Sequence, residues 1–421
     1  MRITDIINKH EFKRTQSINL VASENLMSAE ACQALQSDLT NRYCMPDEKN
    51  RPADMWDYPN QEFTRAVGDQ TERYVREVFG GLYADVRPLS GNNVAYVILK
   101  SLVPPNGNVF SIAGENGGHF TTAEICRREG FSIYSLPYNK ATGNIDIEKV
   151  RELASKIKPD LVFLDASMQL FPYPLRELRE VFGPDVIISF DASHTMGLIA
   201  GGSFQSPFAE GADIIHGSTH KSLFGPQKGL ITCKNDVDHP DRVSARIKEI
   251  VSPLFVSNMH IHNVAALGVA LEEMKEFGEA YSKQVIINSK SFAKALYAEG
   301  LDVLYPEKDF TESHQVICRV ENKGKMKEKM QLLENIYIHA NGIKVPILGG
   351  FGFRFGLAEV TRRGMKEVDV AQIAKLVADC FLERKSPVEM RKTVVDLSHQ
   401  FANIEYAFSS PSEIGLMKCA E

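Results

Sequence analysis

Lys221 has the surroundings in this sequence that most favour chemistry. It follows the apolar residues 212–217 and lies in the stretch HGSTHKSLFGPQKG, directly after Thr219 and His220. Because ligands of open α/β sheets bind where strands end, a lysine placed there can form a Schiff base with a carbonyl compound. The alternative is a solvated surface lysine, which is the commoner environment of this residue type.

Two further apolar runs end in polar residues that could share one rim with Lys221. The run LVFLDAS ends at Ser167, and VIISFDASH supplies Asp191 and His194. Pyridoxal phosphate requires a lysine for an imine and a carboxylate that keeps the pyridine nitrogen protonated. Lys221 and Asp191 together therefore indicate a site for this cofactor, although Asp191 alone could be an ordinary helix cap.

Other segments supply groups that such a site needs. Ser90, Gly91 and Asn92 open an amphipathic helix, whose free N–H groups favour a phosphate; an ordinary N-cap is the alternative. His119 follows two glycines and could stack on a cofactor ring, although a lone histidine is more often structural. Arg354 lies in the alternating run FGFRFGL and could bind an α-carboxylate, unless it faces solvent.

Composition excludes several classes of function. The chain has 421 residues, a net charge of −6 and 24% charged residues, which gives no support to nucleic-acid or membrane binding. No apolar run approaches the roughly 20 residues that span a bilayer. The seven cysteines are scattered and never spaced as C-x-x-C, which argues against disulfides and metal sites. We expect a cytoplasmic protein.

The elements that must position these groups predict an α/β fold with two domains. Short apolar runs alternate with helical patterns through the middle of the chain, which indicates a mostly parallel sheet covered by helices. A long amphipathic helix over residues 263–300 then leads to strand-like pieces and a closing helix. We predict an arm over residues 1–17, a large domain over 18–270 and a small α+β domain over 271–421.

The chain resembles the serine hydroxymethyltransferase family of pyridoxal phosphate (PLP) enzymes over nearly its whole length. The resemblance is carried by NLVASEN, TNRY, LSGNN, GGHFT, FDASHTMGLIAGG, GSTHKSLFGPQKG, FTESHQV and FRFGLAEVTRRGM, in the family's order. It implies the aspartate aminotransferase-type fold, with a seven-stranded type of sheet in the large domain.

The resemblance also implies roles for single residues. Lys221 is similar to the Schiff-base lysine, Asp191 to the pyridinium partner and His119 to the ring-stacking histidine. Arg354 is similar to the arginine that binds the substrate carboxylate, helped by Ser23. Residues similar to further cofactor contacts are Ser90, Gly91, Asn92, Ser167, His194, Thr219, His220, Ser257 and Asn258.

A neighbouring subunit is expected to complete the site. Tyr43 and Tyr58 are similar to tyrosines that one subunit of the family lends to the other, Tyr43 to the catalytic and cofactor set and Tyr58 to the substrate. The resemblance therefore implies an obligatory homodimer with shared active sites, which could pair further into a tetramer.

Departures from the family pattern bear on the activity. Where folate-using members place an essential glutamate two residues after the tyrosine, this chain has Met45, which cannot carry a proton. A longer insert containing Trp56 replaces the usual glycine-rich turn, and Gln227 replaces an arginine. These departures resemble a subgroup of the family, the L-threonine transaldolases, although Trp56 could equally be structural.

The expected activity is transfer of a glycyl unit between aldehydes. L-threonine would lose acetaldehyde, and the resulting glycyl quinonoid would attack another aldehyde to give a new β-hydroxy-α-amino acid. The rivals are a hydroxymethyltransferase that uses folate or a modified pterin, with Glu62 or Glu24 as its proton carrier, and a threonine aldolase. A catalytically silent PLP-fold protein is a remoter alternative.

Overall fold

A computed structural model describes residues 1–44 and 58–408, and its centre is a seven-stranded sheet. The strand order is β2-β10-β9-β8-β7-β3-β4, and only β10 runs against the others. The strands are β2 (Tyr83–Asp85), β3 (Asn108–Ser111), β4 (Ser132–Ser135), β7 (Leu161–Leu164), β8 (Ile187–Asp191), β9 (Ile214–Ser218) and β10 (Gly229–Cys233). The expected mostly parallel sheet is confirmed.

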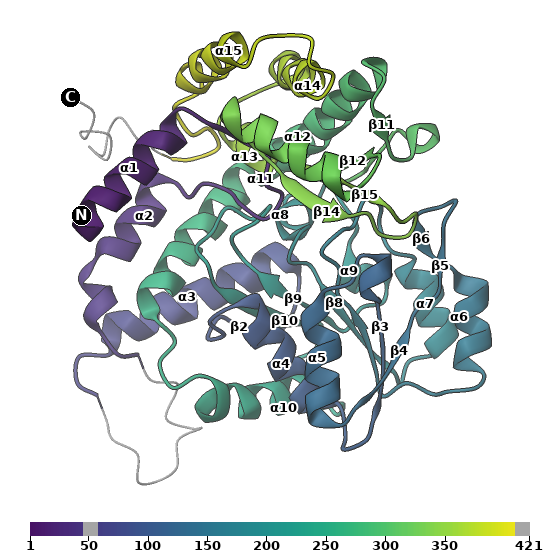
Figure 1. Cartoon of the computed structure of the whole chain (residues 1–421). Coiled ribbons are helices and arrows are strands. Elements are labelled where there is room, and N and C mark those ends of the chain that lie inside the picture. The colour runs from purple at the N-terminus through teal and green to yellow at the C-terminus, as the bar shows by residue number, and fades with distance from the viewer. Residues whose placement is uncertain (45–57, 409–421) are drawn as a thin grey trace.

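Helices cover both faces of this sheet, as a buried parallel sheet requires. In Figure 1, β3 and β4 lie between α4 and α5 on one side and α6 and α7 on the other. The helices before the long α11 are α1 (Ile3–Thr15), α2 (Ala29–Gln36), α3 (Glu62–Phe79), α4 (Gly91–Leu102), α5 (Phe120–Glu129), α6 (Ile147–Ala154), α7 (Leu175–Phe182), α8 (Met196–Ala200), α9 (Pro207–Glu210) and α10 (Val243–Ile250).

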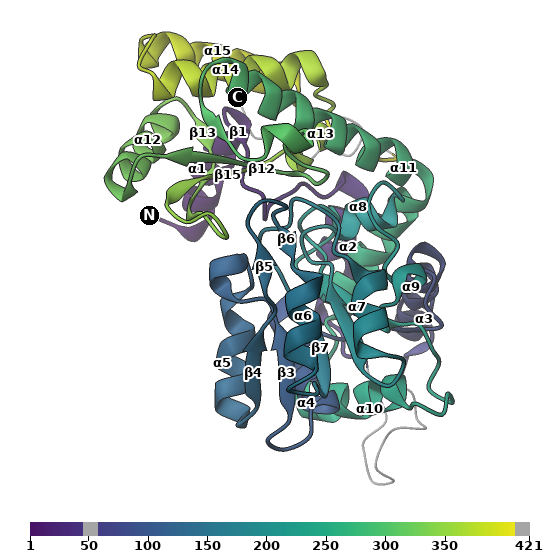
Figure 2. The same cartoon turned by 90° about the vertical axis from the view of Figure 1, so that its right-hand side faces the viewer.

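A four-stranded antiparallel sheet carries a second hydrophobic core (Figure 2). Its order is β11-β12-β15-β14, and its elements are β11 (Asp302–Val303), β12 (Gln315–Val320), β14 (Asn341–Lys344), β15 (Phe351–Gly356), α12 (Lys323–Asn335), α13 (Ala358–Arg362), α14 (Glu367–Phe381) and α15 (Pro387–Gln400). Ile18 and Leu20 belong to this second core, because β1 (Ile18–Asn19) pairs with β13 (Ile338–His339).

The long helix α11 (Ile261–Ala298) connects the two parts of the chain. It packs on α2 and α3 at one end and on α14 at the other, and it runs through the predicted boundary at residue 270. The division into an arm and two domains stays a prediction. Within the described ranges, no helix has the length and apolar character that a membrane crossing requires.

Candidate functional site

The carboxyl ends of β7, β8 and β9 open into one cavity of about 230 Å³. Parallel strands bring their ends to the same edge of the sheet, so residues far apart in sequence meet there. Nine of the residues singled out in the sequence line the cavity, which are Ser90, Gly91, Asn92, His119, Ser167, Asp191, His194, His220 and Lys221.

Lys221 is held through its own backbone. The Asn25 side chain donates to the carbonyl oxygen of Lys221 at 2.8 Å and to the Tyr281 hydroxyl at 2.9 Å. Tyr281 in turn donates to the carbonyl of Ser222 at 3.0 Å. Burial lowers the pKa of Lys221 to about 8, with Asp191 opposing and Arg354 adding to the effect. Near neutral pH the amine is therefore much more often neutral than an ordinary lysine, as a nucleophile must be.

Asp191 and His119 both line the cavity. Asp191 ends β8, and its Oδ1 accepts a hydrogen bond from the Ser193 amide at 2.7 Å, which fixes the carboxylate. His119 is the N-cap of α5, and burial lowers its pKa. Gly118 precedes His119, and a Cβ atom on Gly118 would lie 1.8 Å from the Ile112 carbonyl oxygen. Only glycine can occupy that position.

One end of the cavity holds the residues that the sequence predicts for a phosphate. Ser90 is the N-cap of α4 and accepts from the Asn93 amide at 3.2 Å. The hydroxyl of Ser218 and Nδ1 of His220 are buried without a hydrogen-bond partner among the described residues. Unpaired buried polar atoms around a helix N-terminus suit an anion. The residues present therefore fit PLP, with an amine, a carboxylate and a phosphate cup in one cavity.

Arg354 reaches the rim of the cavity from β15. Its guanidinium donates to the Ser167 carbonyl oxygen at 2.6 Å and to Oδ1 of Asn341 at 3.2 Å. Its Nε is buried and has no partner among the described residues, and burial lowers its pKa to about 10. His194 lies in the cavity wall and stacks on His314, with ring centroids 5.7 Å apart.

Two predicted residues lie beside the cavity instead of in its wall. The hydroxyl of Thr219 is fully buried and donates to the Pro226 carbonyl oxygen at 2.6 Å, so it braces the lysine loop. Ser23 lines a second cavity of about 560 Å³, which shares only His220 with the first.

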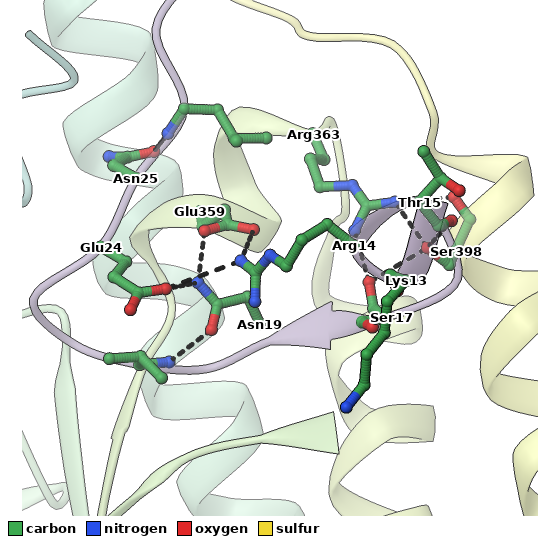
Figure 3. A network of polar contacts seen from close by, with 12 residues as sticks. Lys13, Arg14, Thr15, Ser17, Asn19, Glu24, Asn25, Glu359, Arg363 and Ser398 are labelled. Carbon is green, nitrogen blue, oxygen red and sulfur yellow. Dashed lines mark hydrogen bonds and ion pairs between the residues drawn. The ribbon is translucent and has the colours of Figure 1, made fainter. Parts of the chain in front are cut away.

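A polar network holds the segment that carries Ser23 (Figure 3). The Asn19 amide donates to Glu24 at 2.8 Å and also to Glu359, and Arg14 lies 3.6 Å from Glu24 and 3.5 Å from Glu359. Glu24, one of the two acids considered as a proton carrier, is therefore engaged with this network. Glu62, the other, is exposed at the start of α3.

The tyrosines expected to serve a neighbouring subunit lie outside the cavity of their own chain. Tyr43 and Tyr58 stack with ring centroids 5.4 Å apart, and Tyr43 is 49% exposed. Asn258 accepts a hydrogen bond from the Cys44 amide at 3.4 Å, and Ser257 beside it is exposed. Met45 and Trp56 lie outside the described residues.

Sequence reasoning missed a second carboxyl group in the cavity, that of Asp165. Leu164 pairs with Phe190 in the parallel register, so the next residues, Asp165 and Asp191, lie side by side. Ser111 donates to Asp165 at 2.9 Å and Thr122 donates to its other oxygen. Burial first, and then Asp191, raises the pKa of Asp165 well above its usual value. The signal was present in LVFLDAS, whose aspartate precedes Ser167 by two residues.

Replacing Asp165 by Asn should stabilise the cofactor-free protein, increasingly so as the pH rises. The folded carboxyl stays protonated above the unfolded pKa of about 3.9, so the unsubstituted protein loses stability as pH rises towards the raised pKa. The asparagine side chain does not titrate, so the stability gained by the substitution should grow by at most about 1.4 kcal/mol for each unit by which the pH rises. Urea unfolding at pH 5 and pH 8 measures it. A gain that is equal at both pH values would show that Asp165 is ionised in the folded state.

Comparisons with known proteins agree on one family. The family model described as serine hydroxymethyltransferase matches residues 1–377. Proteins named serine hydroxymethyltransferase are 35% identical in Methanopyrus kandleri, covering 96% of this chain and 94% of the relative, and 34% identical in Archaeoglobus fulgidus, covering 96% and 92%. The crystal structure of an L-threonine transaldolase from Pseudomonas fluorescens, in its internal aldimine state, superposes with a TM-score of 0.90 at 32% identity, covering 96% of this chain and 93% of that one.

Proposed function

Because the chain belongs to the serine hydroxymethyltransferase family, and is thus a PLP-dependent transferase, we propose that it is an L-threonine transaldolase. It would exchange the acetaldehyde portion of L-threonine for another aldehyde and release a new β-hydroxy-α-amino acid. The observation that carries this proposal is Met45, which stands where the folate-using members have their glutamate.

Each group in the cavity has a task in this proposal. When bound, PLP supplies the electron sink that lets a bond at Cα break. Lys221 would hold the cofactor covalently, and Asp191 would keep a proton on its ring nitrogen. His119 would pack against the ring, and the free Nε of Arg354 would take the carboxylate of the amino acid. The buried walls exclude water and strengthen these charge interactions.

Support for a transaldolase comes from the site and from the solved neighbour. A thioether neither donates nor usefully accepts a proton, so Met45 leaves the folate-linked acid/base role without its usual group. Glu24 accepts a hydrogen bond from Asn19 and forms an ion pair with Arg14, so it is a poor substitute for the missing glutamate. The Pseudomonas fluorescens enzyme, similar over 96% of this chain, is itself described as an L-threonine transaldolase.

The second candidate is a hydroxymethyltransferase, because the archaeal relatives at 33–35% identity carry that name. In that case serine would replace threonine, and a folate or modified pterin would accept the one-carbon unit. Glu62, one of the two acids named as its proton carrier, would then have to act from an exposed position at the start of α3.

The two candidates are separated by substrate. With L-threonine and an aromatic or aliphatic aldehyde, we expect acetaldehyde release, consumption of the added aldehyde and a product whose mass corresponds to a β-hydroxy-α-amino acid. With serine and tetrahydrofolate, we expect a rate at least about 100-fold lower, because an acid/base group contributes about 10²–10⁴-fold. Mass spectrometry with and without the folate measures both. Folate-dependent serine turnover as fast as the threonine reaction would return the protein to the hydroxymethyltransferases.

The proposed enzyme is a homodimer in which each subunit completes the other's site. Tyr43 and Tyr58 are stacked outside their own cavity, where a second copy could reach them. In addition, α1 buries none of its residues and exposes Ile3 and Phe12 by 72% and 59%. Exposed apolar side chains on an arm are typical of an interface.

Mixing two inactive variants tests the shared site. Lys221→Ala removes the nucleophile, and Tyr58→Ala removes the residue proposed to act in the partner's site. After subunit exchange, each mixed dimer has one intact site, so about one quarter of all sites should recover in an equal mixture. Acetaldehyde release from L-threonine measures it. Exchange without recovered activity would place Tyr58 in the site of its own subunit.

A further inference from the structure

Lys228 is the only buried lysine among the residues that the structure describes, with 1% of its surface exposed. Its Nζ donates to the carbonyl oxygens of Met259 at 2.8 Å, Pro88 at 3.3 Å and Arg87 at 3.4 Å. An ammonium group has three N–H donors, so this set of carbonyl oxygens uses all of them. Neither the cavity described above nor the proposed reaction accounts for this residue.

The three carbonyls belong to two segments that lead to the phosphate end of the site. Pro88 lies two residues before Ser90, the N-cap of α4. Met259 directly follows Ser257 and Asn258, which the family resemblance assigns to the cofactor. Lys228 itself ends the loop that carries Lys221, and its own carbonyl oxygen accepts from the Thr219 amide at 3.1 Å. One ammonium group therefore joins three segments around the site.

The packing around Lys228 leaves little freedom to the phosphate turn. The amide of Gly229 donates to the Pro88 carbonyl oxygen at 3.2 Å. A Cβ atom on Gly229 would lie 2.6 Å from the carbonyl oxygen of Ser90, so the strand touches the turn directly. The position of Ser90 is thus set by contacts from residues 228 and 229.

A buried ammonium group without a carboxylate partner is costly, so a purely space-filling role would favour an apolar side chain. Burial lowers the pKa of Lys228 to about 7, and Asp85 only partly offsets this. The carboxylate of Asp85 is itself bonded to Arg87, with its Oδ2 2.5 Å from a guanidinium nitrogen. What Lys228 provides, and an apolar residue would not, is a fixed distance between the two segments.

We propose that Lys228 is a positioning residue for the cofactor phosphate, because its ammonium group ties the segment before Ser90 to the segment after Asn258. Lys228 touches neither cofactor nor substrate, and it acts by holding the N-terminal turn of α4 where the phosphate binds. The proposal rests on the phosphate role of Ser90 and Gly91, but not on which aldehyde or amino acid the enzyme uses.

The test compares two aldehydes that differ only in the phosphate. The holoenzyme is stripped of cofactor and titrated with PLP and with pyridoxal, following the absorbance band that either aldehyde gives with Lys221. In Lys228→Met, we expect the affinity for PLP to fall at least about tenfold, the loss of roughly one charged hydrogen bond. The affinity for pyridoxal should change less than about twofold, because the lysine, carboxylate and ring contacts remain.

Matched variants separate positioning from general damage. Lys234→Met makes the same substitution at an exposed lysine directly after β10, and both affinities should stay unchanged. Lys228→Gln keeps two donors and should lose less PLP affinity than Lys228→Met, which also covers the case in which the methionine variant folds poorly. Equal losses for PLP and pyridoxal, or no loss for either, would overturn the proposal. No turnover is measured, so a failed transaldolase assignment would not affect the result.

Discussion

Lys221→Ala should give a colourless protein that has lost its cofactor band and at least about a thousandfold of its activity on L-threonine, because alanine provides no amine for a covalent bond. The loss should be this large because Lys221 is the only amine that lines the described part of the cavity. Its pKa of about 8 makes it a far better nucleophile near neutral pH than an exposed lysine. Absorbance after reconstitution with PLP, together with acetaldehyde release, measures both effects.

Lys234→Ala is the matched control, since Lys234 is exposed and directly follows strand β10. It should retain both the band and the activity. Far-ultraviolet circular dichroism should be unchanged in both variants, because the backbone of Lys221 is held by Asn25 through its carbonyl oxygen, which alanine retains. A Lys221→Ala protein that is still yellow and active would remove this residue from the centre of the site.

The central sheet could be predicted because its strands are short apolar runs bounded by glycine, proline or polar residues. The runs at residues 107–112, 159–167 and 212–220 became β3, β7 and β9. β10, whose residues directly follow the lysine loop, was not among the predicted strands. It pairs antiparallel with β9, a hairpin that the sequence does not mark with a tight turn.

The cavity could be predicted in part because the ends of parallel strands converge, and this requires no knowledge of side-chain contacts. Asn25, Asp165 and Lys228 were not found, because their roles depend on the three-dimensional packing. Asn25 meets Lys221 across 196 positions of sequence. Asp165 meets Asp191 only through the register of two strands, and Lys228 meets Met259 only after the lysine loop has closed. The local sequence pattern does not indicate which residues that are far apart in the sequence come into contact.

Asp191→Asn is expected to leave the fold intact and to slow turnover of L-threonine by at least about 100-fold. The substitution keeps the shape and the oxygen that accepts from the Ser193 amide, but it removes the negative charge. That charge is proposed to keep a proton on the ring nitrogen, and without it the cofactor is a weaker electron sink. Loss of one partner of a buried charge pair costs about 3–5 kcal/mol, which is a factor of about 10² to nearly 10⁴ in rate.

The comparison that makes this result decisive is Asp185→Asn, the same change at an exposed aspartate just before β8. It should turn over L-threonine at the unsubstituted rate.

A second measurement uses the neighbouring carboxyl group of Asp165. The negative charge of Asp191 contributes to the raised pKa of Asp165, and Asp191→Asn removes that contribution. The loss of stability that this variant shows as the pH rises should therefore end at a lower pH than in the unsubstituted protein. If Asp191→Asn turns over threonine at the unsubstituted rate, Asp191 is a strand-end cap. Asp165 is then the only other carboxyl in the described wall of the cavity that could reach the ring nitrogen.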